Sequence, residues 1–356
     1  MQRVSAINSK SINTSKQKPR IDYIDNLRVL ACFLVLLTHS TMPIQEPEKE
    51  MFWEFALFFI GTPASELFLA LSGTVLLPVE TGFRYFYKRR FIKLLPPLII
   101  WSVLGVLLFT RTQDLPWNTA WDLIIHIPVQ PAIGVYWFVY AIAGLYLFAP
   151  FISPWLKTAS KRQIEFFLTL WLINLIIPWI LQFYPNFAGR FSSSGNYYWV
   201  LYCFGGFLGY WLMGYYLNKY PIKIGRNYKW IALMALFIAY PVFVFIARRH
   251  GYDINELSGN LQIGSAVCVA FLYTLLQNIS FSNRIQKAFT GIAKYSFGIY
   301  LTHVYIAREL YWGVFDGSHI HIFPRTFLIA LLTLITGYVL TRLMAFLPKG
   351  KYIIGV

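Results

Sequence analysis

The chain has 356 residues, of which 57% are hydrophobic and only 13% are charged, and its formal net charge is +16. Soluble domains carry about 25% charged residues, and several runs in this chain approach the ~20 apolar residues that a membrane helix needs. This composition excludes a soluble globular domain. It predicts an all-α, polytopic integral membrane protein whose spans leave no room for a sizeable soluble domain.

About ten transmembrane helices are predicted in chain order. Their expected bounds are 24–44, 52–77, 93–111, 133–152, 163–184, 197–217, 229–247, 260–280, 296–312 and 323–346. Residues 1–20 are rich in Ser, Asn, Lys and Gln and are expected to form a disordered basic tail. The membrane domain would then cover residues 21–347, and a short tail would follow at 348–356.

The basic residues are distributed unequally between the two sides of this topology. Of the 31 Lys and Arg residues, 23 fall on the side of the N-terminal tail and seven on the other side, while Arg28 lies near the inner end of the first span. By the positive-inside rule, the tail side is cytoplasmic, so both termini are expected in the cytoplasm. The positive charge therefore reflects topology, and no nucleic-acid partner is expected.

Neither a disulfide nor a metal site is expected. Cys32, Cys203 and Cys268 all fall within predicted helices, where small apolar packing residues are the usual interpretation. His319 and His321 flank a single residue in a predicted outer loop. They have no nearby carboxylate or cysteine cluster, so the pattern is not typical of a zinc site.

Arg28 and His39 lie in the first predicted span. Eleven helical steps end within roughly 20° of three full turns, so both side chains share one helix face and lie about 16 Å apart along the axis. Ionisable groups at mid-bilayer cost about 2.5–3.5 kcal/mol on insertion scales, which favours a functional role. The alternative is that Arg28 only anchors the helix at the cytoplasmic interface and His39 marks the opposite one.

Further candidate residues follow along the chain. Glu66 falls in the second apolar run, where it needs a partner or contact with water, and is a candidate acid, base or orienting group. Arg89, Arg90 and Lys93 belong to a basic hairpin before the third span. They are candidate ligands for an anion, but basic residues at the cytoplasmic end of a span also commonly serve only to orient it. His303 lies in the ninth span and is a candidate second histidine of the site.

The order of these signals resembles acyltransferase family 3, a family of membrane proteins, over nearly the full length. The matching residues are Asp25, Arg28 and His39, then Ser72-Gly73, Trp137-Phe138 and Tyr300-Leu301-x-His303. In the hairpin, Arg90-x-x-Lys93 replaces the Arg-x-x-Arg of the family pattern. Lysine keeps the charge but loses the bidentate fork of arginine.

This resemblance implies an O-acyltransferase of the bacterial inner membrane. The acyl group, usually acetyl, would pass from acetyl-CoA to a hydroxyl of a glycan or lipid-linked sugar. Neutral imidazole is the usual base for such a hydroxyl near pH 7, so His39 is the expected catalytic base, with Glu66 and His303 as further catalytic candidates. Arg28, Arg89, Arg90 and Lys93 would bind the phosphates of the donor.

Two alternatives remain open at this stage. The acyl group can pass directly to the acceptor or through an acyl-histidine intermediate. The protein could instead be a transporter or export component for surface polysaccharide intermediates. Transport would be better signalled by paired repeats or by broken helices in matching halves, and neither pattern is evident in the sequence.

Overall fold

The computed structural model describes residues 21–41, 52–53, 56–57, 59–183, 200–223, 225, 228, 238–252 and 259–356. The tail predicted at residues 1–20 lies outside this part of the chain. Within the described residues all regular secondary structure is helical and no strand occurs. The all-α class predicted from the sequence is therefore confirmed.

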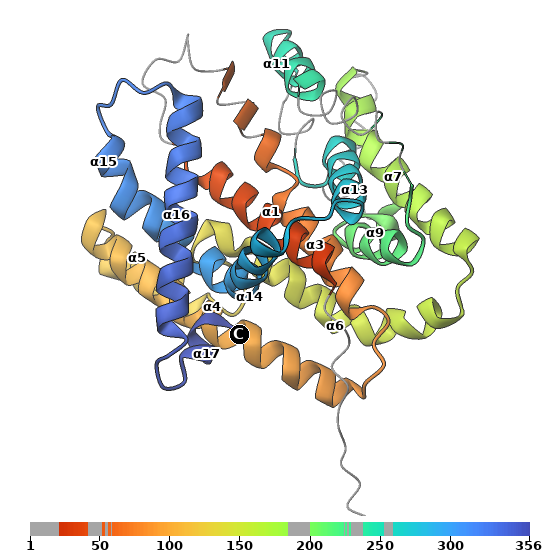
Figure 1. Ribbon diagram of the computed structural model, residues 1–356, viewed down its shortest axis with the longest axis horizontal. Helices are drawn as coiled ribbons and strands as arrows, with labels where there is room; N and C mark the ends of the chain where they lie inside the picture. Colours follow the sequence, from red (N-terminus) through yellow and green to blue (C-terminus); the bar gives the residue numbers. More distant parts are fainter. Residues whose placement is uncertain are drawn as a thin grey trace, which may run out of the picture.

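The helices follow one another along the whole described chain (Figure 1). They are α1 (Asp22–His39), α3 (Ala64–Leu76), α4 (Phe83–Thr112), α5 (Trp117–Ile125), α6 (Trp137–Thr158), α7 (Lys161–Phe183), α9 (Leu208–Lys219), α11 (Tyr240–Arg249), α13 (Ile263–Gln277), α14 (Asn283–Tyr305), α15 (Gly313–Phe315), α16 (Ile322–Met344) and α17 (Gly350–Ile354). Two 3₁₀ turns, η1 (Gly134–Tyr136) and η2 (Tyr202–Phe204), precede α6 and α9, and a π-helix, η4 (Ile306–Trp312), extends α14.

Several helices are suited to a membrane. In the described part of the chain, four segments are long and apolar enough to cross a bilayer, namely Phe59–Leu76, Phe83–Thr112, Gly134–Thr158 and Ile322–Met344. All four overlap predicted spans. The membrane character of the protein thus rests on both composition and helix length.

Helix α1 lies among other helices on nearly every side. It packs against α3, α13, α14 and α16 (Figure 1). Its apolar residues from Leu34 to Leu37 are buried, and so are Asp25 and Asn26 near its beginning. A helix that is buried all round belongs to the core of a bundle. The buried polar groups at its start require partners from the neighbouring helices.

Two glycines bring α3 and α9 into close contact. A Cβ atom on Gly73 would lie 1.9 Å from the carbonyl oxygen of Trp211, and one on Gly214 would lie 1.8 Å from that of Ala70. The Thr74 hydroxyl lies 3.0 Å from the carbonyl oxygen of Gly214 across the same contact. Small residues let membrane helices approach closely enough for such packing and hydrogen bonding. The contact holds α3 in place beside α1.

Replacing Gly214 with Leu should destabilise the bundle, because the new side chain collides with the backbone of α3. Overpacking of this kind costs typically about 1–3 kcal/mol. The measurement is the thermal unfolding of the purified protein in detergent. Gly144→Leu on α6 is the matched control, since a Cβ atom at Gly144 meets nothing within 4 Å. Equal unfolding temperatures for the two variants would contradict the close contact between α3 and α9.

Candidate functional site

A cavity of about 350 Å³ lies between α1, α3, α4, α6 and α14. Its polar lining comes from Arg28, Ser72, Arg90, Lys93, Tyr146, Lys294 and Ser296. Its apolar lining includes Phe68, Leu71, Phe138, Ile142, Phe297 and Tyr300. The cavity therefore combines a basic part with an aromatic and aliphatic wall, a composition suited to an elongated ligand with one charged end.

Basic side chains from three helices converge on this cavity. Arg28 comes from α1, Arg90 and Lys93 come from α4, and Lys294 comes from α14. Arg90 and Lys93 share a face of α4 because they are three residues apart. In the described part of the chain, no acidic side chain forms an ion pair with Arg90, Lys93 or Lys294. Like charges gathered without counter-charges repel one another, and a bound anion relieves this repulsion.

Arg90 is the most enclosed of the cations from α4. Its guanidinium carbon lies 5.8 Å from the centre of the Phe86 ring, a cation–π arrangement. Its Nε is buried and has no hydrogen-bond partner among the described residues. Lys93, one turn further along, is exposed. Arg90 is thus held beside the cavity with an unused donor, whereas Lys93 supplies charge at its edge.

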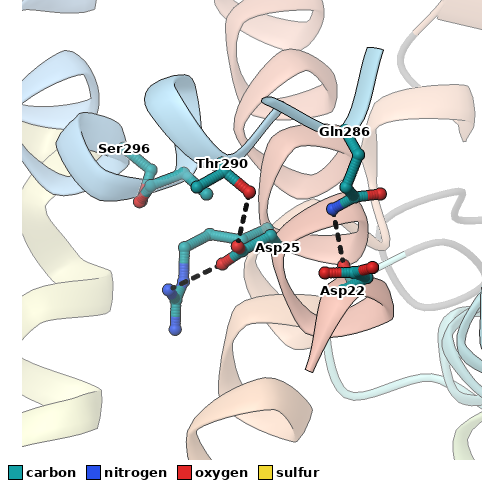
Figure 2. A network of polar contacts seen from close by, with 7 residues as sticks. Asp22, Asp25, Gln286, Thr290 and Ser296 are labelled. Carbon is teal, nitrogen blue, oxygen red and sulfur yellow. Dashed lines mark hydrogen bonds and ion pairs between the residues drawn. The ribbon is translucent and has the colours of Figure 1, made fainter. Parts of the chain in front are cut away.

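Asp25 positions Arg28. The guanidinium Nη1 of Arg28 lies 3.9 Å from Oδ1 of Asp25, and the hydroxyl of Thr290 on α14 donates to Oδ2 over 3.1 Å. Figure 2 shows Thr290 pointing at Asp25 from the neighbouring helix, with Gln286 reaching the backbone carbonyl of Asp22 in the same way. The Asp25 side chain is 4% exposed and that of Arg28 is 32% exposed. The carboxylate is therefore the buried member of the pair, and the guanidinium is the accessible one.

Aromatic contacts lead from the cavity to two histidines. The ring of Phe138 packs against the edge of Tyr300 at a centroid distance of 5.7 Å. The Tyr300 ring lies 5.6 Å from that of His303, which lies 5.2 Å from that of His39. Phe138 and Tyr300 both line the cavity. Its apolar wall thus ends next to a pair of histidines contributed by α1 and α14.

The two histidines differ in their surroundings. His39 is half-buried at the end of α1, whereas His303 is 1% exposed. Nδ1 of His303 is hydrogen-bonded to the carbonyl oxygen of Tyr300. A carbonyl can only accept, so Nδ1 carries the hydrogen and Nε2 of the neutral ring carries the lone pair. This Nε2 is buried without a hydrogen-bond partner among the described residues.

Tyrosines fix the helix that carries His303. The hydroxyl of Tyr136 donates to the carbonyl of Leu301 over 2.6 Å, and the hydroxyl of Tyr300 donates to the carbonyl of Val135. The hydroxyl of Tyr305 donates to the carbonyl of Trp101 on α4 over 2.9 Å. These bonds join the beginning of α6 and the middle of α4 to α14 at the level of the histidines. Buried hydroxyls with such partners make the local geometry rigid.

The structure brings together most of the predicted site residues. Arg28, Arg90 and Lys93 line the cavity, whereas His39 and His303 are outside the lining and lie beside each other next to Tyr300. Arg89 is exposed on α4 and is not part of the lining. Glu66 also lies apart from the lining, in the fully buried face of α3 within electrostatic range of Tyr210. Neither of its carboxylate oxygens has a hydrogen-bond partner among the described residues.

Sequence analysis did not single out two polar residues of the lining, Lys294 and Tyr146. Lys294 resembles an ordinary topology marker in the sequence, and Tyr146 resembles one more aromatic residue of an apolar span. Both become site residues only through the packing of α6 and α14 around the cavity. Within the described ranges, no group of three or more His, Cys, Asp or Glu side chains lies close enough together to form a metal site.

Comparison with known protein families matches residues 21–342 to acyltransferase family 3, described as an acyltransferase domain. This match covers most of the chain, so the protein belongs to this family of membrane acyltransferases. The resemblance inferred from the sequence motifs is thereby confirmed. No curated protein and no solved structure matches the chain significantly.

Proposed function

We propose that this protein is an O-acyltransferase of the bacterial inner membrane that moves an acyl group, most simply acetyl, from acyl-CoA to a hydroxyl of a glycan or lipid-linked sugar. The observation that carries the proposal is the cavity, because its lining gathers cations from three helices and its aromatic wall includes Tyr300, which lies next to the pair of histidines. Coenzyme A has a matching construction, with phosphates at one end and the thioester at the other.

The dimensions of α1 support this arrangement. Arg28 and His39 lie on one face of the helix and are about 16 Å apart along its axis, which is comparable to the length of a pantetheine arm. With the phosphates held at Arg28, Arg90 and Lys93, the arm would extend along the aromatic wall toward Tyr300. The thioester would then lie near the histidines. Charge-assisted bonds from arginine to phosphate are the strongest contacts available for this purpose.

The transfer step follows from the chemistry of imidazole. His39 accepts the proton of the acceptor hydroxyl as its oxygen attacks the thioester carbonyl. The carbon–sulfur bond breaks, the ester forms, and the thiolate of coenzyme A leaves and takes the proton from the imidazolium. No metal or other co-reactant is needed for this exchange. The half-buried position of His39 leaves it reachable by the acceptor.

His303 supports His39 in this scheme. Its Nδ1–H is occupied by the Tyr300 carbonyl, so its Nε2 lone pair can accept a hydrogen bond from an N–H of His39. The second nitrogen of His39 is then left with its lone pair for the hydroxyl. A third group that orients the base serves the same purpose in hydrolase triads. Glu66 is not among the lining residues, so this scheme assigns it no role.

The proposed topology has ten spans with both termini in the cytoplasm. Donor phosphates would then be bound from the cytoplasmic side, where the basic residues gather, and the histidine pair would lie toward the opposite side. Reporter fusions after Lys157 and after Tyr252 should report cytoplasmic and extracytoplasmic locations, respectively. Finding both reporters on one side would contradict this topology.

Alanine at Arg90 should weaken the binding of coenzyme A more than alanine at Lys93, because only arginine grips a phosphate with two parallel bonds. Binding of radiolabelled coenzyme A to the purified protein in nanodiscs measures the effect. Raising the salt concentration should weaken binding by the wild type more than by Arg90→Ala. Lys88→Ala, an exposed site on the same helix outside the lining, is the control. The sequence predicts this basic segment as a hairpin, but the structure shows it as the first part of one continuous helix, α4. Unchanged affinity in both cavity variants at low salt would leave it as a topology marker only.

Alanine at His39 should lower turnover by about 100- to 10,000-fold, the usual contribution of a general base. Affinity for coenzyme A should change little, because the phosphates are bound about 16 Å away along the axis of α1. Arg28→Ala should show the opposite pattern, with weakened donor binding as its main defect. Acetyl transfer from acetyl-CoA to a lipid-linked sugar, followed by mass spectrometry of the product, provides the measurement.

Two outcomes of this experiment would change the assignment. Normal turnover by His39→Ala would transfer the role of base to His303 or Glu66. Movement of the sugar across the membrane by the wild type, without any acylated product, would favour the transporter alternative.

A further inference from the structure

Two residues that follow α17 contribute to the cavity. Gly355 and Val356 are among its lining residues. They lie beyond the family match, which ends at residue 342, and within the segment that the sequence predicts only as a short tail. Figure 1 shows the chain end beside α17 and close to α4. The C-terminal segment, defined here as Gly350–Val356, packs against α4, α14 and α16.

A tight reversal after α16 directs this segment back into the bundle. Lys349 has a positive φ of 61°. A Cβ atom on Gly350 would lie 1.8 Å from the carbonyl oxygen of Met344, so only glycine allows the chain to turn there. Gly355 ends α17 with a φ of 70°, and its N–H donates to the carbonyl of Lys351 over 2.9 Å. This is the usual glycine ending of a helix.

Specific contacts hold the segment in place. The indole N–H of Trp101 on α4 donates to the carbonyl of Ile353 over 3.0 Å, and the Ile354 side chain is fully buried. On α14, a Cβ atom at Gly298 would lie 3.1 Å from Cβ of Ile354, so this glycine makes room for the segment. A Cβ atom at Gly355 would lie 2.6 Å from the carbonyl oxygen of Lys93. The segment therefore forms a packed wall directly beside the backbone of Lys93.

The same segment carries another positive charge, Lys351, which is not itself a lining residue. Lys351 is exposed and lies within electrostatic range of Lys93, as do Arg89 and Arg90. None of these four cations forms an ion pair with an acidic side chain in the described part of the chain. The fold thus accepts repulsion between two lysines from distant parts of the sequence at the edge of one cavity. A bound anion would relieve this repulsion.

We propose that the C-terminal segment is part of the donor site, with Lys351 contacting a phosphate of coenzyme A together with Lys93, and with Gly355 and Val356 closing the wall of the cavity. This inference rests on the proposed function, because it takes acyl-CoA as the donor. It adds a phosphate-binding residue from outside the matched acyltransferase domain.

The test uses the full chain in nanodiscs and two radiolabelled probes, coenzyme A and pantetheine. Pantetheine has the same arm but lacks all phosphates. Lys351→Ala should weaken the binding of coenzyme A by about 3- to 10-fold at low salt, the range expected for one partly screened charged contact. Its binding of pantetheine should equal that of the wild type. Lys287→Ala, which removes the same charge from an exposed site of α14 that is not among the charges acting on Lys93, should bind both probes normally.

A second variant tests the wall. Trp101→Phe keeps an aromatic ring in place but removes the hydrogen bond to Ile353. It should weaken the binding of both probes, because a loosened segment opens the side of the cavity along which the arm lies.

The outcomes separate the inference from the proposed function. Wild-type affinity for coenzyme A in Lys351→Ala, while Arg90→Ala binds weakly, would overturn the inference and leave the proposed function intact. An equal loss of both probes in Lys351→Ala would also overturn the phosphate contact, since it would reveal a general disturbance of the cavity. A wild type that binds no coenzyme A would overturn the proposed function itself.

Discussion

The buried carboxylate of Asp25 connects helix α1 to helix α14, and the rest of the site depends on this connection. It accepts a hydrogen bond from Thr290 of α14 and lies beside the guanidinium of Arg28. An unpaired charge would be very costly in this position. The carboxylate therefore selects the alignment of α1 with α14 in which both partners reach it.

The alignment of α1 with α14 also determines how His39 and His303 lie at the other end of the two helices. His39 lies fourteen residues beyond Asp25, and His303 lies thirteen residues beyond Thr290. At a rise of 1.5 Å per residue, both histidines fall about 20 Å further along their helices. Because α1 and α14 run alongside each other from this anchor, the histidine rings meet at 5.2 Å. One polar contact at the basic end thus sets the register of the proposed catalytic end.

The site separates two physical tasks, charge binding in the cavity and proton transfer beside it. Cations gather at one end, where water is near and the repulsion between them is tolerable. The histidines are not lining residues but lie next to the aromatic wall of the cavity, in ring contact with Tyr300, where hydrogen bonds have fewer competitors. The tyrosine bonds to backbone carbonyls hold this end rigid. A flexible site would lose the alignment that proton transfer requires.

The sequence by itself determined the all-helical membrane class, the shared face of Arg28 and His39, and the spacing of Arg90 and Lys93. Each of these follows from composition or from the period of a single helix. Only the tertiary structure decided that His303 lies beside His39, that Lys294 and the C-terminal segment border the cavity, and that Glu66 lies away from it. These are contacts between residues distant in the chain. They depend on helix register and on close approaches such as that of Gly214 to Ala70, which no local pattern records.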